Sequence, residues 1–555
     1  MMKMIKDNFF ALLPVASVLM LIYLISRLII QPSAQLFLGS IVAYTLRFNL
    51  LVIVVLGFLS YKAFISSFNK ITLTTWLLLG VILAGGFYQF WVASPLTHRV
   101  YFDEDLYIVI AQNIAASNKA LKTNLGTPTS CIEGEYNKDP SGMPAVVSIP
   151  FSLFGPSEYL ASRVTVVISL LNVLLAFLLA YLLFKNQVIA LFSGLIFILL
   201  PENIIWASTV AAEPYQLFFA GLTLLGLVLF KQTRNKYLLM FTLASLAYAA
   251  QVRIEGILLL VPVSLYLMVH FDLEKEKKSK FFVASFILFF LLILPQAFSQ
   301  SAFKGENWGA GSLPMFGFIH FFHNFQTNFA FFFENTRTPL LVTLLAIVGF
   351  FPLREKIRTK LLLSSFFAVF FGIFLFFYAG SYNYGTDVRF SLILNLPLSI
   401  MAAVVCQKIR VFFLGRLPSL LAYTIIFACL FLSFLSVFNC IPLGEESIEG
   451  RYSHDYMVAC LRALPKNSYH FSYDPCIAVI NGQGGGQTFY LLQPDKMKKV
   501  FASAKHVYLF RDIWSHLPPF KDEWHRFYSS HKIKYITGST FRNKAYNLYE
   551  IFENR

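Results

Sequence analysis

Three consecutive carboxylates are the first residues in this sequence whose types and spacing could do chemistry. Asp103, Glu104 and Asp105 follow a long apolar stretch, and from Leu106 onward the apolar residues recur at helical spacing. Helix capping and the favourable interaction of an acid with a helix N-terminus would account for Asp103 alone. Adjacent acids also repel one another, which capping does not require. Both explanations stay open, and the chemical one is a carboxylate that takes a proton from an acceptor hydroxyl.

Basic residues at the same ends of the apolar stretches complement these acids. Four of them would face the same side as the acids: Lys138, Arg163, Arg253 and Arg389. Fixed cations are needed where a phosphate leaves with negative charge. Local pairing is the alternative, because Arg253 lies two residues before Glu255. The same alternative holds for Arg389 and Asp387.

The elements that position these residues are predicted to be membrane-spanning helices. The chain is 57% hydrophobic and 13% charged, with a mean hydropathy of +0.64. A soluble domain is about 45–50% apolar and about 25% charged. Stretches long enough to span a bilayer recur near 9–30, 48–67, 72–93, 164–184, 187–205, 210–230, 237–252, 256–270, 281–299, 338–352, 361–379, 389–405 and 417–438. We therefore predict an α-helical polytopic membrane protein of about thirteen transmembrane helices.

Charge in the loops predicts the orientation of these helices. Lys and Arg gather in every second loop, beginning with Lys3 and Lys6, which places the N-terminus inside and the first span as a retained anchor. The acids then lie outside, in a first large extracytoplasmic loop at 94–163. The net charge of +16 is explained by this topology, so we expect no nucleic-acid partner.

Two domains are predicted from the change in composition after Cys440. Residues 1–440 would form the transmembrane domain, and 441–555 a small extracytoplasmic α/β domain, since the latter segment is polar and contains short strand-like runs. Cys460 and Cys476 could pair there if the compartment is oxidising. The glycine-rich run 481–487 lacks the Lys-Ser/Thr of a phosphate-binding loop, so we interpret it as a flexible turn.

The order and placement of these motifs resembles the C-type glycosyltransferase superfamily, in the branch with the protein O-mannosyltransferases and the lipid A aminoarabinose transferase. The matching segments are Asp103-Glu104 followed by Tyr107, Lys138-Asp139-Pro140, the run from Phe154 to Arg163, Ala212-Glu213-Pro214-Tyr215, and Arg389-Phe390 with Pro397. The family's Lys-Pro-Pro-like segment has Asp139 in place of its first proline here. The first two apolar spans form an N-terminal extension relative to the family.

The resemblance implies an inverting transfer of a hexosyl or pentosyl group from a polyprenyl-phosphate donor to a hydroxyl of a lipid, glycan or protein acceptor. Asp103 would be the general base, and Glu104 would support it or bind the acceptor. Tyr107 and Glu213 would line the cavity. The donor phosphate would be held by the four basic residues named above: Lys138, Arg163, Arg253 and Arg389. No metal and no other cofactor is expected, and the active site would be extracytoplasmic, facing the periplasm or cell exterior in a bacterium and the ER lumen in a eukaryote.

Three alternatives remain open at this stage. A transporter or flippase of lipid-linked saccharides would place its charges at the membrane midplane, in two related halves. A glycan polymerase would use a diphosphate-linked donor instead, and a non-catalytic scaffold would tolerate the loss of Asp103.

His320 and His323 have a spacing that could supply two metal ligands, but the many Phe residues around them are typical of an interfacial helix.

Overall fold

The fold was obtained as a computed structural model and consists of two compact units. The structure describes residues 34–94, 102–135, 140–271, 280–302, 313–334, 337–351, 357–382, 387–414, 445–512, 527, 529 and 531–552. Of these, unit 1 contains 45–94 and 163–414, and unit 2 contains 34–44, 102–162 and 445–552. The predicted spans 9–30 and 417–438, and Lys138, lie outside the described residues. The predicted division of the chain near residue 440 stays a prediction.

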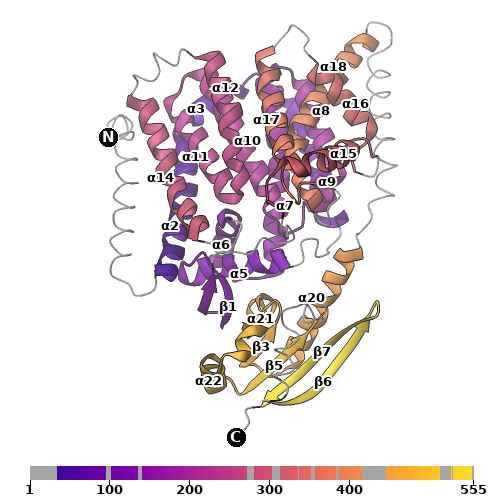
Figure 1. Cartoon of the computed structure of the whole chain (residues 1–555). Helices are drawn as coiled ribbons and strands as arrows, with labels where there is room; N and C mark the ends of the chain where they lie inside the picture. The colour runs from indigo at the N-terminus through magenta and orange to yellow at the C-terminus, as the bar shows by residue number, and fades with distance from the viewer. Residues whose placement is uncertain are drawn as a thin grey trace. The chain divides into compact units, whose positions relative to one another are not determined.

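Unit 1 is built from helices (Figure 1). Two helices cross between the units along the chain, α2 (Ala34–Leu59) and α7 (Glu158–Phe184). The others are α3 (Tyr61–Phe68), α4 (Leu73–Tyr88), η1 (Gln89–Ala93), α8 (Gln187–Leu199), α9 (Pro201–Trp206), α10 (Glu213–Thr233), α11 (Lys236–Val252), η2 (Ile254–Leu259), α12 (Leu260–His270), α14 (Lys280–Ala302), η3 (Phe318–His320), α15 (Phe321–Phe331), α16 (Leu340–Phe350), α17 (Ile357–Leu375), η4 (Asp387–Leu394) and α18 (Asn395–Leu414).

Six of the described helices are long and apolar enough to cross a membrane, by length and composition. They are Phe37–Leu59, Leu73–Val92, Glu158–Phe184, Glu213–Thr233, Phe281–Gln300 and Arg389–Phe413. Every predicted span within the described residues coincides with helical structure. The chain is thus mostly helical and an integral membrane protein, while the number thirteen stays a prediction.

Two interruptions within the predicted spans carry functional candidates. The stretch 187–205 breaks at Leu200, and Pro201 starts α9 at a position where proline is tolerated. The stretch 389–405 begins as the 3-10 helix η4 and becomes α-helical only at Asn395. Departures from α-helical geometry at membrane depth are tolerated where the backbone is buried in protein, and Arg389 and Leu392 of η4 are buried.

Unit 2 combines a mixed β-sheet with helices. Its elements besides the ends of α2 and α7 are α5 (Phe102–Ser117), β1 (Lys122–Thr127), β2 (Ser130–Glu135), α6 (Gly142–Phe154), α20 (Glu445–Ala463), β3 (Ser468–Ser472), α21 (Cys476–Ile480), β4 (Gly484–Gln487), η5 (Thr488–Leu492), α22 (Pro494–Ser503), β5 (His506–Arg511), β6 (Lys532–Phe541) and β7 (Lys544–Phe552). The strand order is β2-β1-β4-β3-β5-β7-β6. Strand β3 runs parallel to β4 and β5, and the other pairs are antiparallel.

The sheet joins two segments that are far apart in sequence. Strand β1, from the segment predicted as the first outer loop, pairs with β4 through Leu125 and Gly486. Leu125 packs in the same apolar cluster as Phe471 and Leu509 of the C-terminal strands. The loop and the C-terminal segment therefore share one hydrophobic core within unit 2.

The glycine-rich run is a strand, so the interpretation of 481–487 as a flexible turn is wrong for its second half. Gly484, Gly485 and Gly486 form β4 between β1 and β3. A Cβ on Gly486 would lie 2.5 Å from the Phe471 ring, and one on Gly485 would meet the Pro475 carbonyl. The glycines are needed because neighbours fill the space on the strand, not because the backbone must bend.

Replacing Gly485 by Ala is expected to lower the free energy of unfolding by about 1–3 kcal/mol, because the added Cβ meets backbone atoms that cannot rotate away. Gly80, in the interior of α4, is the matched control, since nothing lies within 4 Å of an added Cβ there. Gly80→Ala should raise helix stability by about 0.5–1 kcal/mol. Thermal melting of both variants in detergent measures the difference, and equal melting temperatures would contradict the packing argument.

Candidate active site

The three predicted acids occupy the first turn of α5. Glu104 and Asp105 are buried, with 4% and 2% exposure, while Asp103 is half-buried. Successive residues on a helix point about 100° apart, so the turn directs the three carboxylates to different sides. This separation reduces their mutual repulsion and allows each to have different partners. Tyr107, predicted to line the cavity, is buried at 1% exposure.

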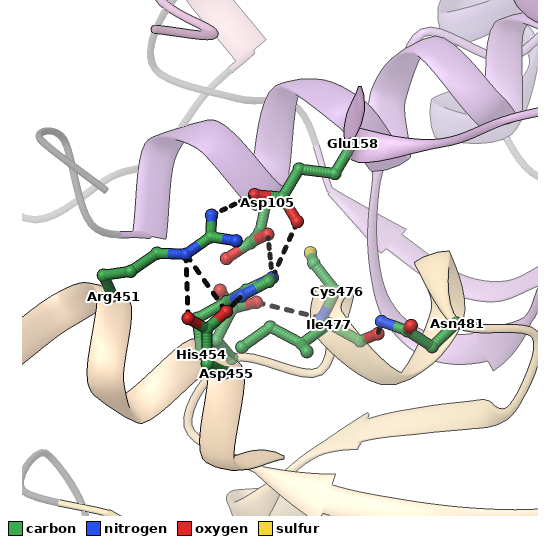
Figure 2. Close-up of polar contacts among 9 residues, drawn as sticks. Asp105, Glu158, Arg451, His454, Asp455, Cys476, Ile477 and Asn481 are labelled. Atoms are coloured by element: carbon green, nitrogen blue, oxygen red, sulfur yellow. Dashed lines mark hydrogen bonds and ion pairs between the residues drawn. The ribbon is translucent and has the colours of Figure 1, made fainter. Parts of the chain in front are cut away.

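Asp105 faces a histidine of the C-terminal segment (Figure 2). His454, on α20, is 4% exposed, and its Nε2 lies 3.6 Å from Asp105 Oδ1. The same nitrogen lies 3.5 Å from Oε2 of Glu158, the first residue of α7. Its Nδ1 lies 3.2 Å from Asp455 Oδ1. A buried imidazole therefore contacts carboxylates from three helices of unit 2.

Arg451 adds a permanent positive charge to this group. It lies one turn before Asp455 on α20, and its Nε lies 3.0 Å from Asp455 Oδ1. Its Nη1 pairs with Glu158 Oε1. Burial would raise the pKa of Asp455, but the hydrogen bond from His454 and the charge of Arg451 outweigh it and hold that pKa below its usual value. Burial would likewise lower the pKa of Arg451, and Glu158 and Asp455 reverse the direction.

We name this set the α20 clamp: Asp105, Glu158, Arg451, His454 and Asp455. Sequence reasoning did not single out this set of residues. A signal was present, since the amphipathic segment around Arg451 and Asp455 carries charges at helical spacing. Nothing local indicated that His454 would meet Asp105, more than three hundred residues away.

A second charged cluster lies in unit 1, where it joins three of the predicted residues. Arg253 Nη1 lies 2.6 Å from Glu213 Oε1, and Arg389 Nε lies 3.2 Å from the same oxygen. Arg253 Nε lies 2.5 Å from Glu255 Oε1. The side chains of Glu213, Arg253 and Arg389 are at most 8% exposed. The local pair of Arg253 with Glu255, left open as an alternative, is thus formed, and Glu213 holds both guanidinium groups.

Arg163 is the remaining predicted residue in unit 1. Its recorded contacts among the described residues are with Trp91 and not with this cluster. Arg163 donates from Nη1 to the Trp91 carbonyl at 3.1 Å, and its guanidinium carbon lies 3.9 Å from the centre of the Trp91 ring. A cation over an aromatic face is favourable, more so where water is scarce. The side chain of Asp387 lies outside the described residues, as does Lys138.

Sequence reasoning also missed a buried acid in unit 1. Glu202, on the short helix α9, is 2% exposed, and its Oε2 accepts a hydrogen bond from Trp206 Nε1 at 3.0 Å. Arg337 Nη1 lies 3.8 Å from its other oxygen. The signal was available, because an acid inside the apolar stretch 187–205 is a functional candidate by default. Among the described residues of unit 1, the two buried acids, Glu202 and Glu213, are therefore both ion-paired.

Among the described residues, the histidines and cysteines considered above form neither a metal site nor a disulfide. His320 Nε2 lies 2.9 Å from the Pro314 carbonyl oxygen. Among the described residues, no group of three or more His, Cys, Asp or Glu could hold a metal ion. Cys460 and Cys476 are buried and free, so the disulfide considered between them is not formed.

Cys476 is expected to resist alkylation in the folded protein. It is 1% exposed, and burial, reinforced by Asp474 and Asp105, raises the pKa of its thiol well above the usual value. A raised pKa leaves almost no thiolate at neutral pH, and the thiolate is the reactive form. Iodoacetamide labelling followed by mass spectrometry should find Cys476 unmodified at pH 7 and modified after denaturation. Equal labelling rates in the two states would contradict this burial.

Comparisons with known proteins agree with the resemblance seen in the sequence. The family model described as dolichyl-phosphate-mannose-protein mannosyltransferase matches residues 120–308. No curated protein sequence matches the chain. The ArnT structure of Cupriavidus metallidurans with bound undecaprenyl phosphate is 13% identical, with a TM-score of 0.56, over 86% of this chain and 98% of that one. Its apo form gives 15% identity and the same TM-score of 0.56. The oligosaccharyltransferase of Archaeoglobus fulgidus, in complex with zinc and sulfate, is 10% identical, with a TM-score of 0.51, over 82% and 71% of the two chains.

The chain is thus an integral membrane protein with the fold of the C-type glycosyltransferases. The predicted resemblance is confirmed: a mannosyltransferase family model matches the segment from β1 through α14, and ArnT and an oligosaccharyltransferase share the fold. At these identities the structural similarity concerns the fold. The roles of individual residues have to be argued from this chain.

Proposed function

We propose that this protein is a glycosyltransferase that moves a monosaccharide from a polyprenyl-phosphate donor to an acceptor hydroxyl. The observation that carries the proposal is the acidic first turn of α5, where Asp103 is partly accessible while Glu104 and Asp105 are buried. The family-model match and the undecaprenyl phosphate bound by ArnT support a lipid-phosphate donor. The half-buried Asp103 carboxylate, unlike the two buried carboxylates that follow it, is the one that can reach a substrate proton.

In the proposed reaction the acceptor oxygen attacks the anomeric carbon of the donor sugar. Asp103 takes the hydroxyl proton as the new carbon–oxygen bond forms. The bond from the anomeric carbon to the phosphate oxygen breaks, and polyprenyl phosphate leaves with the bonding electrons. Attack from the face opposite the phosphate inverts the anomeric configuration. Glu104, predicted either to support Asp103 or to bind the acceptor, is buried and would therefore support Asp103, and Tyr107 would help to shape the cavity.

The leaving phosphate needs positive charge. The ion pairs of Arg253 and Arg389 change the order in which we propose the basic residues as its ligands. In the second cluster two guanidinium groups meet two carboxylates, Glu213 and Glu255, which leaves it with little net charge. We therefore propose Lys138 first as the phosphate ligand and Arg163 second. Arg253 and Arg389 would contribute less, since a phosphate must compete with Glu213 for them.

The proposed location follows from the same chemistry and from the loop charges. The acids and the C-terminal domain, residues 441–555, would face the extracytoplasmic side, and the helices of residues 1–440 would cross about thirteen times. In a bacterium this is the outer face of the inner membrane, where the enzyme would act in glycosylation of the cell envelope.

The test is a transfer assay with the purified full-length protein in nanodiscs. Radiolabelled polyprenyl monophosphates carrying hexoses or pentoses, and a diphosphate-linked glycan, would each be offered with a host envelope extract as acceptor. Transfer from one monophosphate donor supports the proposal, and the anomeric configuration of the product reports inversion. Transfer from the diphosphate donor alone indicates the polymerase alternative. Movement of intact lipid-linked saccharide across the bilayer without transfer indicates a flippase.

A further inference from the structure

We propose that the α20 clamp positions the catalytic acids, with His454 as a positioning residue that acts through Asp105. This inference rests on the proposed function and deepens it. It gives the C-terminal segment a role in catalysis, because side chains of α20 contact the first turn of α5 and restrain it.

The contacts that carry the inference come from three helices of one unit. His454 reaches from α20 to Asp105 on α5 and to Glu158 on α7, at 3.6 and 3.5 Å. Figure 2 shows Arg451, His454 and Asp455 on one helix turned toward these two acids. A single imidazole nitrogen thus lies between the helix that carries the proposed base and the helix that follows the outer loop.

The charges make the imidazolium form of His454 the one that fits this position. Three carboxylates face it, Asp105, Glu158 and Asp455, and among the ion pairs recorded between described residues Arg451 is the second cation against them. An imidazolium donates from both ring nitrogens, and here Nδ1 faces Asp455 while Nε2 faces the other two acids. A neutral ring would donate from one nitrogen only and turn the lone pair of the other toward a carboxylate, which is repulsive.

A further helix, α21, lies near Asp105. Helix α21 packs against α5. Its first residue, Cys476, hydrogen-bonds through its backbone N–H to Asp474 Oδ1 at 2.9 Å. Asp474 and Asp105 both raise the pKa of the Cys476 thiol, in addition to its burial, so Asp474 brings a further negative charge to this side. The groups that face the clamp are thus mainly acidic, and the cations that offset them among the described residues are His454, Arg451 and, near Cys476, Lys122 of β1.

The consequence for catalysis follows from helix geometry. Asp105 is two residues after Asp103 on the same turn, so an interaction that restrains Asp105 also restrains the direction of Asp103. A displacement of about 1 Å of a catalytic group can cost about a hundredfold in rate. His454 therefore affects turnover without touching either substrate.

The experiment compares His454→Gln with a matched control, His506→Gln, in the full-length protein. His506 forms the same type of pair in unit 2, with Nδ1 2.9 Å from Glu550 Oε1, on strands β5 and β7. The expected result for His454→Gln is a fall in kcat of about 10- to 100-fold with little change in donor KM. The double variant with Asp105→Asn should lose little beyond Asp105→Asn alone, because both changes break the same contact. His506→Gln should leave both constants unchanged.

Two further readouts separate positioning from general stability and from the proposed function. In wild type, kcat should fall on the alkaline side as the His454 imidazolium loses its proton, and this fall should be absent in His454→Gln. Hydrogen exchange of peptides covering Phe102–Ser117 needs no substrate, and it should quicken in His454→Gln but not in His506→Gln. Unchanged exchange of α5 overturns the clamp even if no donor is found. Faster exchange with an unchanged kcat in an active enzyme overturns its role in catalysis.

Discussion

Asp103→Asn is expected to lower sugar transfer by about 10²- to 10⁴-fold while the protein folds and still binds its donor. Asparagine has nearly the shape of aspartate and caps a helix equally well. It cannot accept the acceptor's hydroxyl proton at neutral pH. The substitution therefore preserves the shape and hydrogen bonding of the side chain at the start of α5, and besides the proposed chemical role it removes only a charge–helix interaction of about 0.3–1 kcal/mol. Transfer of labelled sugar, followed beside donor binding, measures the two effects separately.

The control for this result is an acid in the same structural position without the proposed role. Asp495 lies in the first turn of α22, in the same unit, and is exposed. Asp495→Asn should leave transfer unchanged. If Asp103→Asn retains wild-type transfer, the capping explanation of the acidic turn is sufficient and the catalytic assignment is wrong.

Glu213→Gln is expected to destabilise the folded protein by about 3–5 kcal/mol. Glu213 Oε1 faces two guanidinium groups, from Arg253 and Arg389, in a site where all three side chains are at most 8% exposed. The amide keeps the shape and removes the negative charge, so two buried cations lose their shared partner. The loss should be visible as a lower melting temperature in detergent and as earlier aggregation on heating.

The control is the same Glu-to-Gln substitution in an ion pair that is exposed to solvent. Glu133 pairs with Lys496 in unit 2, where the Glu133 side chain is 36% exposed. Glu133→Gln should cost at most about 1 kcal/mol, because exposed pairs contribute little. If both variants melt at the wild-type temperature, the Glu213 cluster does not stabilise the fold. It would then be better explained as a site that opens to accept an anion.

The sequence could predict the features that depend on local pattern. Apolar stretches of membrane-spanning length mark the helices, because hydrocarbon imposes both composition and length on a helix. The acidic turn at Asp103, the charged residues at helix ends and the order of family motifs are also local. They were sufficient to indicate the C-type glycosyltransferase fold. Local pattern alone, however, mistook Gly484–Gly486 for part of a turn, since the same glycines serve a strand with no room for side chains.

What only the tertiary structure decided is which charged residues meet. His454 faces Asp105 and Glu158, and Glu213 holds both Arg253 and Arg389, across separations at which no periodicity operates. These pairings arise because a buried charge must find an opposite charge, and the packing of helices and strands determines which one is within reach. The sequence by itself therefore determined the kind of protein and the residue types available for chemistry. The fold decided their partners, since those depend on contacts between distant parts of the chain.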